Sequence, residues 1–392
     1  MTKHKTTKNT CSACGTSPIN HELLYTFNVL EETIGKLGEF LMSSSKSNQL
    51  GNAVEKILHS FLSSVGMVRF SKDVDKASSG RSQLVWEEAN RRGIPMEQIV
   101  IFGKHIEHYR AKINNKNYYF ESLPIPPWFP QSGYAWIDNK LTLAKKLKLA
   151  QIPSPNTEVI ITKNQAKKAF NKISKPLIIK PKNGSRGRHT TTNINTLEEI
   201  NRAVRLAKQI TPIMVAQEHL FGSVYRATVI NNKLVGFFRA DPPQVTGNGK
   251  STIQELIKAK NENHHELLSD IEINKELIDF IQRQNFNLES VLPHDLTIDL
   301  IAKTGRMYGG YTKEMLPEVH PKMHEIFKKA GEVANAPVLG FDLIIQDPKI
   351  DPDTQRWGII ECNSLPFIDL HYFALEGQPI NLAKNVWDLW KV

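Results

Sequence analysis

The chain has 392 residues, of which 40% are hydrophobic and 23% charged, and a formal net charge of +10. This length predicts two or three domains, while the lack of a roughly 20-residue apolar run or an apolar signal core argues against a membrane protein and predicts a cytoplasmic one. The positive charge favours a binder of nucleotides or acidic substrates over nucleic acid, because no aromatic residues are interleaved among the lysines.

The first feature along the chain is a pair of cysteines, Cys11 and Cys14, in CxxC spacing with His4 and His21 nearby. A zinc site normally uses four such ligands, and a second cysteine pair is missing. The pattern therefore favours two thiols that take no part in a metal site. Three cysteines, counting Cys362, form no disulfide framework. A zinc knuckle completed by histidines is the alternative that stays open.

Helical periodicity dominates the next stretch. Apolar residues recur at three- and four-residue steps from Leu23 to Leu41, and a second helix is expected near residues 53–65. We expect residues 1–75 to form a helical extension that carries no visible chemistry. Such a hairpin packs against the rest of the chain or dimerises, so a homodimer is one expectation.

A small α/β domain is expected over residues 76–132. The segment from Ser78 to Pro95 predicts a helix with a charged face that ends at Gly93. A proline-rich stretch then marks a linker that ends near residues 132–133. Three short strands are expected before this linker, at residues 99–102, 111–113 and 117–120.

A basic strand and loop stand out in the remaining domain, residues 133–392. After a basic helix over 138–149, the apolar strand Leu177–Pro181 carries Lys180 near its end, and a loop with two spaced glycines follows. Glycines let backbone N–H groups approach an anion, and a lysine supplies a point charge, so the pair is typical of a phosphate site. A solvated basic turn is the simpler alternative. We expect a lid subdomain at about residues 150–222.

Further elements complete this domain. A hairpin is expected over residues 229–239 with Arg239 at its end, then a long helical section to about Phe286, and a helix at Pro321–Ala334. The charges near Glu314 read as a helix-like surface run. A strand is also expected at residues 213–218.

Two late apolar runs suggest a metal site. Glu361 and Asn363 follow an apolar run and, in a strand, would point to the same side about 7 Å apart. An upstream run from Val338 to Ile345 carries the acid Asp342, which would be costly to bury alone. If the two strands pair antiparallel, three oxygen-bearing side chains gather as Mg²⁺ requires. A surface hairpin with ordinary charges is the less favoured interpretation.

These motifs occur together in a fixed order, with further matches between them. With them the chain resembles the ATP-grasp superfamily, and within it the ligase domain of cyanophycin synthetase and of the bifunctional glutathione synthetases. The resemblance covers roughly residues 136 to 390. It rests on Asp138-Asn139-Lys140, Lys180-Pro181, Gly184–Arg188, Gly222–Arg226, Arg239, Val245–Gly249, Gly309-Gly310, His320-Pro321, Asp342, Glu361, Asn363 and His371.

The resemblance implies an α+β fold, in which two α/β subdomains clasp ATP, preceded by a helical and a pre-grasp-like α/β extension. It also implies roles. Arg226 and Arg239 would face the acyl-phosphate and substrate carboxylates as catalytic residues. The metal ligands Asp342, Glu361 and Asn363 would hold two Mg²⁺ ions, for which Mn²⁺ could substitute. The nucleotide contacts would be Lys140, Lys180, Gly184, Ser185, Gly187, Gln217, Glu218 and Leu220.

The chain departs from the family pattern at several positions. The ribose-binding acid expected after Gly222 is replaced by Val224, and the usual Gly-Asp-Gly turn reads Gly247-Asn248-Gly249. Ala374 replaces a proline beside His371. Because such changes gather where the amide-forming substrate is expected, we expect a substrate different from those of the named relatives. No second ligase half is expected after Val392, so a complete cyanophycin polymerase is not expected.

The favoured function is an ATP-dependent carboxylate–amine ligase that forms an amide or peptide bond through an acyl phosphate, on amino acids or short peptides. The alternative is a catalytically silent nucleotide-binding regulatory module. The intact set of Asp342, Glu361 and Asn363 argues against that alternative. A nucleic-acid binder that uses the basic N-terminal arm is a third and weaker interpretation.

Overall fold

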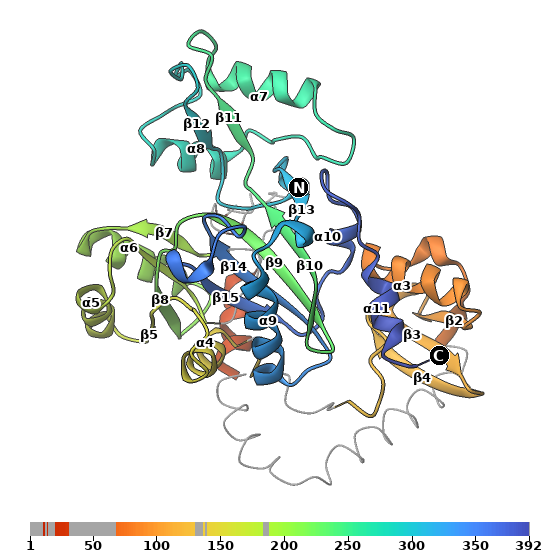
Figure 1. The fold of residues 1–392 in the computed structure, drawn as a ribbon. Helices are drawn as coiled ribbons and strands as arrows, with labels where there is room; N and C mark the ends of the chain where they lie inside the picture. The colour runs from red at the N-terminus through yellow and green to blue at the C-terminus, as the bar shows by residue number, and fades with distance from the viewer. Residues whose placement is uncertain are drawn as a thin grey trace, which may run out of the picture. The chain divides into compact units, whose positions relative to one another are not determined.

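A computed structural model describes residues 11, 14, 20–30, 68–129, 136–137, 139–182 and 188–391. The expected second helix near residues 53–65, the glycine loop with Gly184, Ser185 and Gly187, and Asp138 lie outside the described residues. The chain divides into two compact units, each built from separate segments (Figure 1). The first unit comprises Met1–Ile34, Pro155–Val224 and Ala240–Thr312, and the second comprises Gly35–Ser154, Tyr225–Arg239 and Lys313–Val392.

The second unit contains a five-stranded sheet in the order β13-β10-β9-β14-β15. Helices α4 (Lys140–Leu149) and α9 (Pro321–Ala334) cover one face of this sheet and bury Leu143, Leu147 and Phe327 there (Figure 1). The expected helix at Pro321–Ala334 is confirmed. The strands are β9 (Ser223–Ile230), β10 (Lys233–Ala240), β13 (Thr312–Glu314), β14 (Val338–Ile345) and β15 (Gly358–Asn363).

The expected hairpin at residues 229–239 is confirmed as β9 and β10. Asn231 and Asn232, between the strands, have φ of 49° and 59°, which is the left-handed backbone that two-residue hairpin turns require and that asparagine tolerates. Glu314 was wrongly expected in a helix-like run: it belongs to strand β13 and is 1% exposed. Its three-residue strand is too short to show a period of two.

A four-stranded antiparallel sheet in the order β1-β2-β3-β4 also belongs to the second unit. Helix α3 (Gly80–Arg91), in which Ser79 Oγ caps the N–H of Ser82, packs on it together with the C-terminal helix α11 (Leu382–Asp388). The expected helix and three strands are confirmed, and a fourth strand precedes them. The strands are β1 (Val68–Ser71), β2 (Met96–Ile101), β3 (Lys104–Ile113) and β4 (Lys116–Glu121).

The first unit contains a four-stranded antiparallel sheet in the order β5-β8-β6-β7. Helices α5 (Lys163–Lys172) and α6 (Leu197–Ala207) pack on one face, and each begins with a capping box that satisfies its first N–H groups. The expected strands at 177–181 and 213–218 are confirmed. The strands are β5 (Thr157–Ile160), β6 (Leu177–Pro181), β7 (Thr191–Ile194) and β8 (Met214–Glu218).

A second core of the first unit surrounds the strand pair β11 (Gln244–Thr246) and β12 (Thr297–Asp299). The long helical section expected to reach Phe286 is two helices, α7 (Ile253–Glu262) and α8 (Lys275–Gln282). Asn274 caps the start of α8, so the chain must leave the helical conformation before it. No helix among the described residues has the length and apolar character needed to cross a membrane.

The N-terminal cysteines lie close to two histidines in the structure. Residues 21–30 form a helix, and Asn28 Nδ2 donates to the carbonyl of Ile210 at 2.6 Å. Cys14 is 3% exposed and lies with Cys11 beside His21 and His189. His189 is remote in sequence, which is why the spacing of the cysteines did not reveal it. His4 lies outside the described residues.

Candidate functional site

The two late apolar runs pair as expected. Strands β14 and β15 are antiparallel, with Asp342 directly opposite Glu361 and Gly340 opposite Asn363. Phe341 and Leu343 point into the core, so Asp342 points away from it. Asn363 Nδ2 lies 3.5 Å from Asp342 Oδ2. The hairpin therefore gathers the three oxygen-bearing side chains that the sequence suggested as metal ligands.

A bulge in β15 puts Glu361 on the right face. The register changes after Asp342, so that Leu343 pairs with Ile359 and Ile360 is an extra residue. Ile359 and Cys362 are both in the core, which a regular strand could not achieve because residues three apart point to opposite faces. The bulge thus buries Ile359 while Glu361 and Asn363 face away from the core. Nothing in the sequence signalled this bulge.

Arg226 on β9 holds Asp342 with both ends of its guanidinium. Its Nε donates to Asp342 Oδ1 at 2.5 Å and its Nη2 to Oδ2 at 2.9 Å. Burial acts to lower the pKa of Arg226, but the charge and hydrogen bonds of Asp342 outweigh it, so the pKa lies above its ordinary value. Gly340 makes room for this pair, since a Cβ there would lie 2.9 Å from Arg226 Nη1.

Lys140 supplies a second cation. It is the first residue of α4, where Asn139 Oδ1 accepts from the N–H groups of Leu141 and Thr142 and so fixes the start of the helix. The Lys140 side chain is 6% exposed, and its Nζ lies 3.4 Å from Glu361 Oε1. Each carboxylate of the hairpin therefore has one cationic partner, and the four charges sum to zero.

A group of buried polar side chains lies beside this face. His371, in the short helix α10 (Asp369–Tyr372), lies 2.7 Å from Thr228 Oγ1 through Nε2 and 2.5 Å from Glu314 Oε2 through Nδ1. The ring lies so close to Gly236 that a Cβ there would be 2.5 Å from His371 Nδ1. His371 and Glu314 are 0% and 1% exposed. These contacts give His371 a structural role, locking α10 onto β9 and β10.

Arg239, near the end of β10, is half-buried. Phe237 lies in the core with α9, whereas Gly236 and Phe238 contact His371 on the opposite face. Strand alternation therefore assigns Arg239 to the face of Phe237, not to the face that carries Arg226. The geometry thus separates the two arginines that the sequence treated together.

No protein-family model matches the chain. The cyanophycin synthetase of a Synechocystis species is 31% identical over 249 residues, which are 61% of this chain and 28% of that protein. A bifunctional glutathione biosynthesis protein from Clostridium perfringens is 26% identical over 64% of this chain and 34% of its own length. The chain thus spans about a third of these curated relatives.

Among solved structures, a bifunctional glutathione synthetase from Pasteurella multocida is similar over 79% of this chain and 44% of that chain, with a TM-score of 0.55 and 22% identity. The chain has the ATP-grasp fold. The ATP-grasp resemblance inferred from the sequence motifs is therefore confirmed at the level of the fold. Mixed helices and antiparallel sheets in both units agree with it.

In this ATP-grasp chain, the residues expected to contact the nucleotide in the first unit lie together on one sheet. On β6, Leu177 and Ile179 face the core with α5 and α6, so Lys180 points to the opposite face. Lys180 pairs with Val215, and Ile178 with Gln217, across β6 and β8. Gln217 is therefore on the same face as Lys180, and its Nε2 donates to Thr157 Oγ1 at 2.8 Å.

Hydrogen bonds hold the end of β8 and the residues that follow it. The N–H of Glu218 donates to Asn156 and that of His219 donates to Pro176, while the Glu218 carboxylate accepts from Asn156 at 3.2 and 3.3 Å. Leu220, at the end of the segment, is 3% exposed. The Glu218 side chain thus helps to hold this segment in place.

The hairpin fits the divalent metal that the ATP-grasp fold implies. Asp342 and Glu361 are opposed and 19% and 29% exposed, so a ligand can reach them while the strands hold them in place. Two carboxylates and the amide oxygen of Asn363 form the all-oxygen set that Mg²⁺ prefers. Arg226 and Lys140 compensate their charge when no metal is bound.

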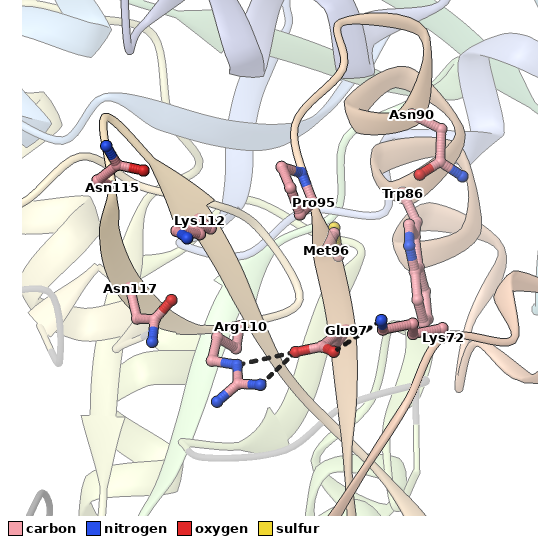
Figure 2. A pocket seen from close by; sticks show the side chains of 10 residues that line it. All are labelled: Lys72, Trp86, Asn90, Pro95, Met96, Glu97, Arg110, Lys112, Asn115 and Asn117. Carbon is pink, nitrogen blue, oxygen red and sulfur yellow. Dashed lines mark hydrogen bonds and ion pairs between the residues drawn. The ribbon is translucent and has the colours of Figure 1, made fainter.

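A hollow of about 590 Å³ lies away from these residues, on the sheet β1-β2-β3-β4 (Figure 2). Glu97 stands between two cations there, with its Oε2 3.0 Å from Arg110 Nε and its Oε1 3.9 Å from Lys72 Nζ. Arg110 also lies 3.6 Å above the ring of Phe70. Because these polar groups pair with one another and none of the expected site residues lines the hollow, we assign it no function.

Proposed function

We propose that this ATP-grasp chain is an ATP-dependent carboxylate–amine ligase that acts on amino acids or short peptides. The observation that carries the proposal is the β14–β15 hairpin, which places Asp342, Glu361 and Asn363 together beside Arg226 and Lys140. The similarity to cyanophycin synthetase and to the glutathione biosynthesis protein supports the same reaction class.

The reaction has two steps. A carboxylate oxygen of the first substrate attacks the γ-phosphorus of ATP, and ADP leaves, giving an acyl phosphate. The nitrogen of an amine then attacks the acyl carbon, inorganic phosphate leaves with the carboxylate oxygen, and the amine loses a proton. Both steps develop negative charge on oxygens, so fixed cations and exclusion of water accelerate them more than a side-chain nucleophile would.

The hairpin residues would hold the metal. Asp342, Glu361 and Asn363 each offer an oxygen to Mg²⁺, which when bound neutralises the phosphate oxygens and aligns them with the attacking carboxylate. Two Mg²⁺ ions, with Mn²⁺ as a substitute, are our proposal for the number and kind. Lys140 would exchange Glu361 for a nucleotide phosphate as the metal takes its place.

The two arginines would act on the reacting oxygens. Arg226 holds Asp342 in place and presents its fork toward the same face, a geometry that suits a phosphoryl or acyl-phosphate group. Arg239 keeps the catalytic assignment that the resemblance implies, although strand alternation places it on the face of Phe237. Substitution of Arg239 is therefore the sharper test of the two.

The first unit would contribute further nucleotide contacts. Lys180 would pair with phosphate oxygens, and the loop with Gly184, Ser185 and Gly187 would offer backbone N–H groups to them. The backbone of Gln217, Glu218 and Leu220 would line the adenine. We further propose that residues 133–392 form the ATP-grasp region and that the reaction takes place in the cytoplasm, where ATP is abundant.

A screen of amino acids and dipeptides for ATP-dependent release of ADP and phosphate tests the proposal. We expect release only when a carboxylate and an amine substrate are both present, and only with Mg²⁺ or Mn²⁺. The Glu361→Gln protein is the matched control. ATP binding without turnover for any pair would instead support a regulatory nucleotide-binding module.

A further inference from the structure

Four metal-ligating side chains converge in the first unit, outside the site described above. Cys14 Sγ lies 3.0 Å from His21 Nε2 and 3.4 Å from His189 Nε2, and Cys11 Sγ lies 4.0 Å from the same His189 nitrogen. All four ligand atoms are within 4.8 Å of one another. We call Cys11, Cys14, His21 and His189 the Cys₂His₂ cluster.

These distances are close to those of a tetrahedral zinc site. With Zn–S bonds of about 2.3 Å and Zn–N bonds of about 2.0–2.1 Å, the ligand atoms of such a site lie roughly 3.4–3.8 Å apart. The three sulfur–nitrogen distances of the cluster scatter around this range. Two thiolates would cancel the charge of Zn²⁺, so the bound site is neutral, and binding would release the two thiol protons to solvent.

The surroundings of His189 resemble those of a metal-bound histidine. Its Nδ1 lies 2.9 Å from the carbonyl oxygen of Leu206, which orients the ring and leaves Nε2 to face the cysteines. Leu206 is in the last turn of α6, where the helix dipole favours a cation. His189 is 1% exposed and has a φ of 51°, a backbone conformation that non-glycine residues seldom adopt. A buried histidine held this way calls for a specific cause.

Packing alone explains the cluster less well. Cys14 is buried as an apolar residue would be, and the rings of His21 and His189 meet edge to face at 4.9 Å. Such contacts, however, require no particular orientation of the sulfur and nitrogen atoms. Here two sulfurs and two ring nitrogens, drawn from segments about 175 residues apart in sequence, point to one position.

We propose that the Cys₂His₂ cluster binds one structural Zn²⁺ ion. The ion would tie Cys11, Cys14 and the helix at residues 21–30 to His189, in addition to the hydrogen bond from Asn28 to Ile210. His189 stands two residues before β7, so the ion would also hold the chain where it enters this strand. Sulfur and imidazole ligands select zinc over magnesium, so this site is distinct in chemistry from the hairpin.

Metal analysis of the full-length protein tests the proposal. We expect about one zinc per chain after purification without added metal. The Cys14→Ser and His189→Asn proteins should bind Zn²⁺ more than about 100-fold more weakly, measured by competition with a chromophoric chelator. Asparagine tolerates the backbone of position 189, so that change removes the ligand with little strain. Cys362→Ser and His294→Asn, which change residues outside the cluster, should keep the metal.

A measurement on the unmodified chain guards against variants that fail to fold. After zinc is removed with a chelator, added Co²⁺ should give the visible bands of tetrahedral cobalt and a thiolate-to-cobalt charge-transfer band, with one ion bound per chain. Purified chain without stoichiometric zinc, together with a cobalt spectrum that lacks the thiolate band, would overturn the proposal. A Cys11–Cys14 disulfide found by mass analysis of the protein purified without oxidant would also overturn it.

Discussion

The two ligand clusters of this molecule hold their groups in opposite ways. In the hairpin of the second unit, two partly exposed carboxylates are each paired with a cation, Arg226 or Lys140. In the first unit, Cys14 and His189 of the Cys₂His₂ cluster are almost fully buried. An ion that competes with arginine and lysine exchanges readily, as a cofactor that arrives with a nucleotide must. An ion held by buried thiolates and imidazoles exchanges slowly.

The largest effect is expected from a substitution in the β14–β15 hairpin that does not touch the Cys₂His₂ cluster. Glu361→Gln keeps the shape of the side chain but removes one metal-ligand charge, so turnover should fall by about 10³-fold. Melting temperature without nucleotide and zinc content should stay near those of the unmodified chain. Phosphate release, thermal denaturation and metal analysis on one preparation check this. Normal turnover with Mg²⁺ would mean that the metal site is elsewhere.

Arg239→Lys sharpens the comparison within the second unit. If the planar fork of Arg239 stabilises the acyl-phosphate oxygens, kcat should fall by about 10²-fold with a smaller effect on ATP affinity. Lysine keeps the charge, so a merely structural arginine would give the reverse, a lower melting temperature with near-normal kcat. Steady-state kinetics and thermal denaturation of the same sample separate the two. Near-normal turnover would remove Arg239 from the catalytic residues.

Much of the hairpin could be predicted from the sequence, because its ligands lie on two apolar runs whose few polar residues mark one face. The bulge at Ile360 could not, since it depends on burying both Ile359 and Cys362. The Cys₂His₂ cluster could be predicted only in part, because Cys11, Cys14 and His21 stand close in sequence and His189 does not. His189 is about 175 residues away from Cys14 in sequence, and no periodicity connects the two.

Prediction of the sheet β1-β2-β3-β4 from the sequence had the same limit. Its strands and α3 could be predicted from local patterns, but the C-terminal helix α11 that completes its core lies about 260 residues further along the chain. Trp387 Nε1 donates to the carbonyl of Val85 at 2.9 Å, a contact that no local sequence pattern predicts. Long-range packing, more than local propensity, decided what the sequence left open.

Lys180→Ala tests the first unit's share in nucleotide binding. Loss of one charge-assisted hydrogen bond to a phosphate should weaken ATP binding by roughly 10-fold or more. Titration calorimetry with ATP and Mg²⁺ measures this, and Lys172→Ala, on the surface of α5, is a matched control. If the affinity is unchanged, Lys180 does not belong to the nucleotide site.

The smallest effect is expected from a substitution of Glu107, an acid whose hydrogen bonds stabilise the fold. Its Oε1 accepts from the hydroxyls of Ser79, Ser82 and Ser122 at 2.6, 2.7 and 3.1 Å. Burial acts to raise the pKa of Glu107, but these hydrogen bonds and the charge of Arg81 outweigh it and hold the pKa below its ordinary value of 4.5.

Glu107→Gln should therefore lower the melting temperature by roughly 2–4 °C at pH 7 and leave turnover unchanged, the opposite of Glu361→Gln. A lowered pKa stabilises the fold above the ordinary pKa, and that stability is lost as the pH falls through the folded value. The difference between the two proteins should thus shrink below about pH 4.5. A difference that grows on acidification would contradict the role given to these hydrogen bonds.

The most direct test of the proposed ligase follows the carboxylate oxygen. With a substrate pair found in the screen, the carboxylate is labelled with oxygen-18 and the released phosphate is analysed by mass. Attack of the carboxylate on ATP transfers one of its oxygens to phosphorus, so the account predicts one labelled oxygen in the phosphate for each amide formed. Unlabelled phosphate would mean that water attacks ATP, and it would contradict the acyl-phosphate mechanism.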